Sequence, residues 1–381
     1  MTKDKIWLSS PHMGGHEQEF VKQAFDDNWV APLGPNVNGF EADLASYIGE
    51  EKYVAALSSG TAAIHLALVM LGVKHGDFVI CQSMTFSASA NPILYQGAHP
   101  IFIDSETRTW NICPTDLVDA IEGTIKKHGV KPKAIIAVHL YGMPYLSDEI
   151  NAIAMKYDIP IIEDSAEALG SKYNEQSCGT LAKFGILSFN GNKIITTSGG
   201  GALVTKTEEE KQKAIFFATQ SRDQASHYQH SEIGYNYRMS NITAGIGRGQ
   251  MIILDKHVKL RRANYDFYKE NLGNLPGFEF VEEPEGIYSN RWLSAVLIHP
   301  KEAGFTREDL RLALEKENIE SRPLWKPMHM QPIFKDCDYY GTKVAENLFD
   351  IGLCLPSGSN LKDSDRARIL EAIIQFRNEK L

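Results

Sequence analysis

The sequence predicts an α/β protein with a mostly parallel sheet, and two features of the chain carry this prediction. Short apolar runs alternate with longer helical patterns, as where YVAAL is followed by the alanine-rich AAIHLALVML. The distance between successive runs leaves room for a helical crossover, which parallel strands require. One run, Ile159 to Ile162, contains three isoleucines and no polar residue. Such a run is typical of a strand that is buried on both faces.

The individual elements follow from turn residues and periodicity. Two prolines and two glycines predict a loop from Asn28 to Gly39. An amphipathic helix is expected from Phe40 to Ile48, and a later helix after the GYNYRMS segment is expected to continue through Arg262 or beyond. Further strands are expected at residues 53–57, 78–81, 99–104, 134–139, 184–189, 202–205 and 292–298, and further helices at 62–71, 306–317, 344–351 and 363–376.

A change in composition predicts where the chain divides. Glycines, prolines and several acidic residues gather between Gly273 and Gly286, a composition that is typical of a domain boundary. We therefore expect a large α/β domain at residues 1–272, with a substrate loop near its N-terminus, and a small C-terminal α+β domain at residues 273–381.

Composition excludes several classes of protein. The net charge of −9 and the lack of a basic run argue against nucleic-acid binding. The N-terminus lacks a secretory apolar core, and no segment is long enough to span a bilayer. Five scattered cysteines without a C-x-x-C pair are expected to be reduced thiols of a cytoplasmic protein. There is no H-E-x-x-H either, so no metal site is expected.

A short polar turn after the strand at residues 53–57 is a candidate anion site. Ser59, Gly60 and Thr61 stand between this strand and the N-terminus of the next helix. The amides of a first helical turn have no partner inside the helix, and the helix dipole is positive there. These residues could hold a phosphate, although a simple helix cap by Ser or Thr has the same pattern.

An acid and an amine follow two neighbouring strands. Glu163 and Asp164 come directly after Ile159 to Ile162, and Lys193 lies beyond the apolar run Phe184 to Phe189. Ligands of α/β proteins bind at the carboxyl ends of such strands. Pyridoxal phosphate chemistry needs this pair: a lysine forms the Schiff base, and a carboxylate keeps the pyridine nitrogen protonated. The alternative is an ordinary strand-end acid and a surface lysine. Phe86, at the end of a polar loop, could stack on a flat cofactor.

The order of these motifs resembles one family closely. A phosphate turn, a ring aromatic, E-D-x-A, S-F-x-x-x-K, G-G and G-Y-N-Y-R-M follow one another between Asn28 and His329. Together they resemble the DegT-type sugar-nucleotide aminotransferases, a branch of the fold type I pyridoxal phosphate enzymes. The resemblance implies a transaminase with pyridoxal 5'-phosphate as its cofactor, and a large domain that binds it.

The resemblance also implies roles for single residues. Lys193 matches the Schiff-base lysine, which also moves the substrate proton, and Asp164 matches the acid that pairs with the pyridine nitrogen. Asn236 matches a residue that reaches the phosphate from the neighbouring subunit, which implies a homodimer with shared active sites. The other cofactor contacts implied are Ser59, Gly60, Thr61, Phe86, Glu167 and Ser188.

Two positions depart from the family's pattern. Many members carry Gln or His where Glu167 stands, near the phenolic oxygen of the cofactor, and an ionised Glu would repel that oxygen. Glu167 is therefore expected to be protonated or turned away. Many members also carry His before the lysine, where this chain has Asn192. Related sugar dehydratases have His in place of the lysine, so Lys193 argues against that chemistry.

Within the family, SFNGNKIITTSGGG and RPLWKPMHMQP look most like the bacillosamine-pathway type. This implies amino transfer from glutamate to a UDP-linked 4-keto-6-deoxy N-acetyl sugar. The alternatives are a 3-keto sugar, a GDP- or dTDP-linked sugar, or a non-catalytic cofactor-binding regulator. Two Pro-rich aromatic loops are expected to hold the sugar nucleotide, because loops supply specificity on a rigid scaffold. Their candidate contacts are Asn28, Trp29, Val30, Ala31, Trp325, Lys326 and His329.

Overall fold

An eight-stranded sheet forms the centre of the protein, whose computed structural model describes residues 4–49 and 51–380. From one edge to the other, its strands are β1 (Tyr53–Leu57), β9 (Gly201–Thr205), β8 (Phe184–Ser188), β5 (Ile161–Asp164), β4 (Ala134–Val138), β2 (Phe78–Gln82), β3 (His99–Ile103) and β14 (Asp338–Tyr340). Strand β9 is antiparallel to both of its neighbours, and every other pair is parallel. The predicted α/β fold with a mostly parallel sheet is confirmed.

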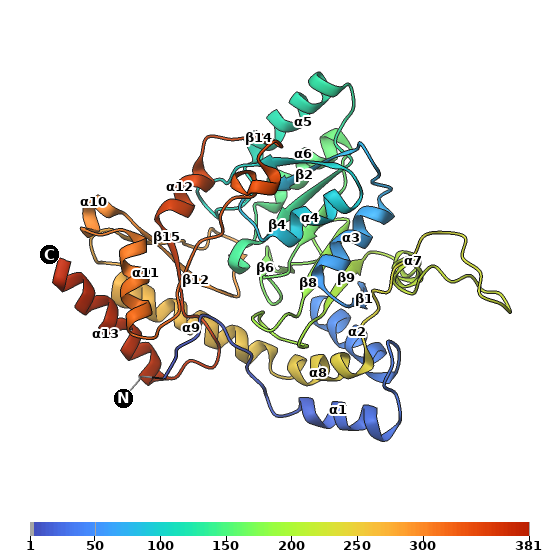
Figure 1. Ribbon diagram of the computed structural model, residues 1–381, viewed down its shortest axis with the longest axis horizontal. Helices are drawn as coiled ribbons and strands as arrows, with labels where there is room; N and C mark the ends of the chain where they lie inside the picture. Colours follow the sequence, from blue (N-terminus) through green and yellow to red (C-terminus); the bar gives the residue numbers. More distant parts are fainter. Residues whose placement is uncertain (1–3, 50, 381) are drawn as a thin grey trace.

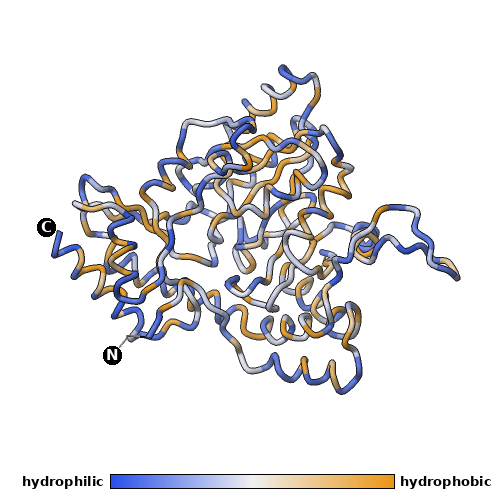
Figure 2. Tube along the Cα trace, viewed as in Figure 1, coloured by the Kyte–Doolittle hydropathy of each residue, from blue (hydrophilic) through white to orange (hydrophobic). Residues whose placement is uncertain are grey.

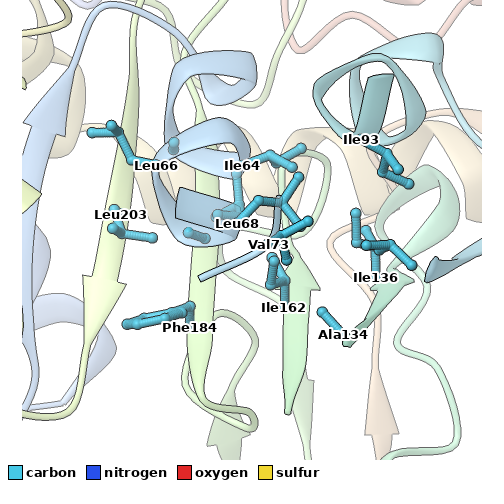
Figure 3. Packing of buried hydrophobic residues seen from close by; sticks show 14 of the residues in the cluster. Ile64, Leu66, Leu68, Val73, Ile93, Ala134, Ile136, Ile162, Phe184 and Leu203 are labelled. Carbon is cyan, nitrogen blue, oxygen red and sulfur yellow. The ribbon is translucent and has the colours of Figure 1, made fainter. Parts of the chain in front are cut away.

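Helices cover both faces of this sheet (Figure 1). Adjacent residues of a strand point to opposite faces, and β2 shows both. Val79 and Cys81 pack with helices α3, α4 and α7, whereas Ile80 packs with α5 and α6. Figure 3 shows the packing on the face that α3, α4 and α7 cover, where Ile64 and Leu68 of α3 lie over the sheet. The helices that cover the sheet are α2 (Pro35–Ile48), α3 (Gly60–Met70), α4 (Ser87–Tyr95), α5 (Pro114–His128), α6 (Ser147–Tyr157), α7 (Glu208–Ala218) and α8 (Asn241–Met251).

A second, antiparallel sheet lies in the C-terminal part of the chain, where both termini are also found (Figure 1). Its strands are β10 (Phe278–Phe280), β12 (Ser294–Ile298), β15 (Gly352–Leu355) and β13 (Arg322–Pro323). Helices α9 (Leu254–Leu272), α11 (Arg307–Lys316) and α13 (Asp363–Lys380) share a buried apolar cluster with it. Figure 2 shows apolar residues concentrated in the interiors of both parts. The remaining α-helices and strands are α1 (Glu17–Asp26), α10 (Pro300–Ala303), α12 (Val344–Ile351), β6 (Lys172–Tyr173), β7 (Gln176–Ser177) and β11 (Ile287–Tyr288), and three short 3-10 helices are η1 (Leu140–Gly142), η2 (Met328–Met330) and η3 (Pro332–Phe334).

Two structural facts bear on the predicted division at residues 272 and 273. Helix α9 ends at Leu272, the last residue of the predicted large domain. Strand β14, from the C-terminal part, nevertheless pairs with β3 of the large sheet. The outer limits of the two predicted domains, residues 1 and 381, lie outside the described residues. The division itself stays a prediction.

Helix α2 begins five residues earlier than the sequence predicts, at Pro35. Proline suits the first position of a helix, where its missing N–H costs nothing. The cap comes from far along the chain, because Asn241 Oδ1 accepts hydrogen bonds from the amides of Asn36 (2.8 Å) and Val37 (3.2 Å). A local pattern does not reveal such a cap, so the predicted loop was too long.

Two further boundaries differ from the prediction. The single helix expected to pass Arg262 is broken into α8 and α9, because Ile253 leaves the helical conformation (φ −111°, ψ 4°). The strand expected from Ile159 to Ile162 is β5, which starts at Ile161 and includes the acids Glu163 and Asp164. Pro160 cannot donate a ladder hydrogen bond, and the strand begins after it. Among the described residues, no helix is long and apolar enough to cross a bilayer.

Candidate active site

A cavity of about 280 Å³ opens at the carboxyl ends of the parallel strands. Because β9 is antiparallel to both neighbours, β1, β8, β5, β4 and β2 all end at this edge of the sheet. The loops that follow these strands therefore meet there. The predicted residues that line the cavity are Ser59, Gly60, Thr61, Phe86, Asp164, Glu167, Ser188, Lys193 and Trp325.

The small polar turn after β1 forms one wall of the cavity. Ser59 is the N-cap of α3, and its Oγ accepts a hydrogen bond from the Ala62 amide at 3.0 Å. The capping role of Ser59 is therefore real, and it leaves the Gly60 and Thr61 amides at the positive end of the helix dipole. A Cβ on Gly60 would lie 3.1 Å from the Ser188 Cβ. This close approach brings Ser188, at the end of β8, beside the helix N-terminus.

Asp164 is held in a defined orientation at the end of β5. Its side chain is buried, with 4% of its surface exposed. Oδ2 accepts a 2.6 Å hydrogen bond from Ser89 Oγ, and Oδ1 accepts one from the Ala166 amide at 3.1 Å. Thr85 in turn bonds Ser89 at 2.7 Å. Because each carboxylate oxygen accepts one of these hydrogen bonds, rotation of the side chain is restricted. Asp164 is thereby oriented to bind a cationic group in the cavity.

The adjacent acid, Glu163, belongs to the opposite face of the sheet. It accepts hydrogen bonds from His139 Nε2 (2.7 Å), Gly179 N (2.5 Å) and Leu181 N (2.7 Å). The Tyr145 amide donates to His139 Nδ1 at 3.1 Å, so both ring nitrogens of His139 are engaged. Possible metal-ligand atoms of His139, Glu163 and Cys178 lie within 4.8 Å of one another. The side chains of His139 and Glu163 are already engaged in the hydrogen bonds described above. The group has a structural role in holding the loop after β7.

Lys193 lies in the segment between β8 and β9, and its side chain enters the cavity. Its Nζ is 3.5 Å from Glu167 Oε1 and 4.2 Å from the centre of the Trp292 ring. Only 12% of the side chain is exposed. Glu167 Oε2 accepts a 2.7 Å hydrogen bond from the Tyr141 amide. Burial raises the pKa of Glu167, and the charge of Lys193 acts in the opposite direction. Glu167 thus presents one oxygen to the lysine amine.

The remaining predicted contacts lie outside this cavity. Asn236 is exposed, and so are residues 28–30 of the N-terminal loop. Lys326 is exposed next to Trp325. His329 is mostly buried: its Nδ1 lies 2.7 Å from Ser83 Oγ, and its ring stacks on Tyr339 at 3.8 Å. The roles that the resemblance implies for these residues stay predictions. Outside the cavity lie Asn28, Trp29, Val30, Ala31, Asn236, Lys326 and His329.

Sequence reasoning missed two side chains that shape the site. Trp292 was included in an apolar strand, yet its ring lines the cavity and faces the Lys193 amine. Ninety-nine residues separate the two positions in the printed sequence, so no local pattern could link them. Ser89, the donor to Asp164, stands three residues after Phe86. A serine in the first turn of the helix that follows Phe86 could have been recognised as a possible hydrogen-bond donor to the site.

The lining residues fit the predicted cofactor. A phosphate needs N–H donors at a helix N-terminus, which Gly60 and Thr61 offer. A pyridine nitrogen needs a fixed carboxylate, which Asp164 offers, and the aldehyde needs a shielded amine, which Lys193 offers. All three lie around one cavity whose walls also carry the rings of Phe86, Trp292 and Trp325. The donor set therefore matches pyridoxal phosphate.

Comparison with known proteins agrees with this chemistry. EpsN of Bacillus subtilis (strain 168), by name a pyridoxal phosphate-dependent aminotransferase, is 52% identical over 98% of this chain and 96% of its own length. The GDP-perosamine synthase of Escherichia coli O157:H7 is 36% identical over 98% and 99% of the two chains. The structure named as the sugar aminotransferase Spr1654 of Streptococcus pneumoniae, in its PLP form, matches with a TM-score of 0.89 and 26% identity, covering 99% and 100%.

A family model also matches almost the whole chain. Residues 11–374 fit the model described as the DegT/DnrJ/EryC1/StrS aminotransferase family. The predictions of a fold type I structure, of an aminotransferase and of pyridoxal phosphate as its cofactor are thereby confirmed. On the evidence of its site, its fold and these matches, the chain belongs to the DegT/DnrJ/EryC1/StrS aminotransferase family.

Proposed function

We propose that this protein transfers the amino group of glutamate to a UDP-linked 4-keto-6-deoxy N-acetyl sugar. The observation that carries the aminotransferase step is the placement of Lys193 and Asp164 around one cavity at the carboxyl ends of the strands. Relatives named as a GDP-perosamine synthase and as sugar aminotransferases support a sugar nucleotide as acceptor. The UDP and the 4-keto position rest on the resemblance of the two loop sequences to the bacillosamine-pathway type.

Each side chain has a defined task in this proposal. When bound, pyridoxal phosphate supplies an electron-accepting ring. Gly60 and Thr61 bind its phosphate, with Ser188 beside them, and Asp164 holds a proton at the ring nitrogen. Lys193 carries the cofactor and moves the proton between carbon centres, while Trp292 and Glu167 shield and orient its amine. The buried ring of Trp292 shields the lysine amine from water, which strengthens the electrostatic contacts there.

Glu167 supports the proposal in a specific way. The resemblance left two possibilities for it, a protonated carboxyl or one turned away. Tyr141, held at φ 55°, directs its amide at Oε2, so the orientation of the carboxyl is set by the backbone. Burial raises the pKa of Glu167 and therefore favours its protonated form. A carboxyl in that form does not repel a phenolic oxygen.

We also propose that the active form is a homodimer with shared sites. The connection between α7 and α8 projects from the body of the protein (Figure 1), and its Tyr228 and Ile233 are 78% and 81% exposed. Asn236 lies in the same connection, close to the start of α8. Asn241 ties the N-terminal loop to the same region, since its amide donates to Ala31 O at 2.8 Å. Asn236 and the N-terminal loop, two of the predicted groups that lie outside the cavity, are thus connected to each other, and in the proposed dimer they contribute to the partner's site.

A product assay tests the substrate. The purified enzyme, with glutamate, is given UDP-, dTDP- and GDP-linked 4-keto and 3-keto sugars, and the amino sugar is identified by mass. We expect amination of the UDP-linked 4-keto sugar to be fastest. Preference for a GDP-linked sugar, which the similarity to the perosamine synthase favours, would replace the UDP assignment and leave the aminotransferase step intact. No amination of any sugar would refute the proposal.

A further inference from the structure

The segment that carries Lys193 has no regular secondary structure of its own. Residues 189–200 belong to no helix or strand, and their backbone hydrogen bonds to one another join Phe189 N to Gly200 O, Thr197 N to Phe189 O and Lys193 N to Asn190 O. A reactive amine must nevertheless stand in one place, because small displacements of a reacting group are costly. Side chains from elsewhere in the fold add further hydrogen bonds to the backbone around Lys193.

Three consecutive carbonyl groups of this segment are each bound by a distant side chain. Trp292 Nε1 donates to Asn192 O at 2.7 Å. Arg261 Nη2 donates to Lys193 O at 3.3 Å. His257 Nδ1 lies 3.2 Å from Ile194 O, as a donor. Arg261 and His257 stand four residues apart on α9, hence on one face of this helix.

Arg261 also controls the residue that faces the lysine amine. Its Nη1 donates to the carbonyl of Trp292 at 2.6 Å, and the Trp292 ring lies 4.2 Å from Lys193 Nζ. The same guanidinium reaches Ser357 O at 3.3 Å and Ser9 Oγ at 3.0 Å. One side chain thus binds the backbone of Lys193, the backbone of Trp292, whose ring lies beside the lysine amine, and two segments at opposite ends of the chain.

The environment of Arg261 is unusual for a structural arginine. It is 1% exposed, and its recorded hydrogen bonds go to carbonyls and one hydroxyl, with no carboxylate among them. Burial lowers the pKa of Arg261 to about 9. A buried charge without a counter-ion is costly, and an apolar side chain would fill this space more cheaply. Carbonyl oxygens that must be held in place are a reason to keep the charge here.

We infer that Arg261, together with His257, is a positioning residue that holds the Lys193 backbone and the Trp292 ring in register for amino transfer. This inference rests on the proposed role of Lys193. The interaction joins α9 to the cavity without either residue lining it. Helix α9 thereby couples the C-terminal part of the fold to the reactive amine.

The test compares Arg261→Met with Arg262→Met in the holoenzyme. Arg262 is the next residue of α9 and pairs with Glu283 instead of the lysine segment, so its loss controls for a general loss of stability. For Arg261→Met we expect kcat to fall about 100-fold while the KM for glutamate changes little. The visible circular dichroism of the bound cofactor should also weaken, and Arg261→Lys should restore part of both. Arg262→Met should keep kcat and the dichroism.

Two further measurements keep the test decisive. If Arg261→Met does not fold, His257→Phe keeps the ring that stacks on His12 and loses only the donor to Ile194. A lower kcat and weaker dichroism in it support the inference. Unchanged kcat and dichroism in Arg261→Met, or in His257→Phe where Arg261→Met fails, overturn it. Borohydride labelling of the wild type distinguishes failure of the proposed function from failure of this inference. A label on a residue other than Lys193 refutes the proposed role of Lys193. A label on Lys193, together with unaffected variants, refutes this inference alone.

Discussion

Asp164 and Glu163 are adjacent in sequence but have different roles in the structure. They are consecutive in β5, so their side chains point to opposite faces of the sheet. Asp164 meets Ser89 and lines the cavity, while Glu163 is enclosed by His139 and the amides after β7. The sequence shows two neighbouring acids. The alternation of side chains along the strand directs Asp164 into the cavity and Glu163 into a structural hydrogen-bond network on the other face.

Lys193 should be the residue that carries the cofactor. It is shielded on both sides by Trp292 and Glu167, whereas Lys183 pairs with Glu210 and is 42% exposed. We expect the purified protein to be yellow. Borohydride reduction and peptide mapping should place the pyridoxyl group on Lys193. A label on Lys183 would contradict the assignment.

Replacing Asp164 by Asn should slow turnover more than it weakens cofactor binding. A neutral amide cannot hold a proton on the ring nitrogen, so the developing negative charge loses its stabilisation. The phosphate contacts at α3 remain, and much of the cofactor should stay bound. We expect kcat to fall on the order of 100-fold or more. The cofactor content is measured by absorbance, and near-normal turnover would rule out this role.

Glu163→Gln is the matched control for that variant. It neutralises the neighbouring buried acid, which accepts several hydrogen bonds but does not line the cavity. We expect about 1–3 kcal/mol of lost stability, because a buried amide cannot accept from all of those donors. The kcat of the folded fraction should change little.

Replacing Lys326 or His329 should affect the sugar-nucleotide half-reaction more than the glutamate half-reaction. Lys326 is exposed beside Trp325, where a pyrophosphate could meet it, whereas His329 packs against Ser83 and Tyr339. We expect Lys326→Ala to weaken use of the sugar nucleotide and to leave the glutamate half-reaction almost unchanged, since glutamate does not span the loop. His329→Ala tests the same predicted role from a buried position. Equal losses in both half-reactions, for either variant, would indicate a structural contribution only.

Helix α8 shows why a glycine-rich helix can be rigid. Gly245, Gly247 and Gly249 lie where α1 and α2 approach it closely. A Cβ on Gly249 would lie 2.6 Å from the backbone of Glu17, which cannot move away without shifting α1. The glycines therefore serve close helix packing. In the sequence alone, G-I-G-R-G looks only like a weakened helix.

Gly249→Ala should therefore destabilise the protein although alanine is the better helix former. Overpacking against a backbone costs about 1–3 kcal/mol, more than the roughly 1 kcal/mol that helix propensity returns. Chemical denaturation measures the difference. Gly191→Ala is the control, because the nearest atom to its added Cβ is 3.8 Å away, and its stability should stay close to that of the wild type. Equal stability of the two variants would show that α1 can shift freely.

The whole molecule should work as a dimer in which each subunit completes the other's site. Mixing Lys193→Ala with Asn236→Ala subunits, refolded together, should give hybrids with one intact site. Random pairing of equal amounts predicts recovery of about a quarter of wild-type activity. Each variant refolded alone should stay inactive. No recovery, with hybrid dimers demonstrated and an inactive Asn236 variant, would place Asn236 in its own subunit's site or outside any site.

Much of this fold could be predicted from sequence because its signals are local. Buried strands are continuous apolar runs, and β1 has the bounds that its apolar run predicts; helix α12 likewise has its predicted bounds. Lys193 and an acid at the end of the Ile159–Ile162 run could be chosen because each follows a strand and the chemistry requires both, and the resemblance then selected Asp164 rather than Glu163. Phe86 could be chosen from its place at the end of a polar loop, the resemblance added Ser188, and both line the cavity.

Tertiary structure alone decided the contacts that span long stretches of chain. The cap of α2 comes from Asn241, the ring beside Lys193 comes from Trp292, and the carbonyl of Lys193 is held by Arg261. Composition and periodicity report which residues are buried and in which local conformation. They carry no information on which distant donor satisfies a given carbonyl, because that partner is selected only when the two parts of the chain pack together.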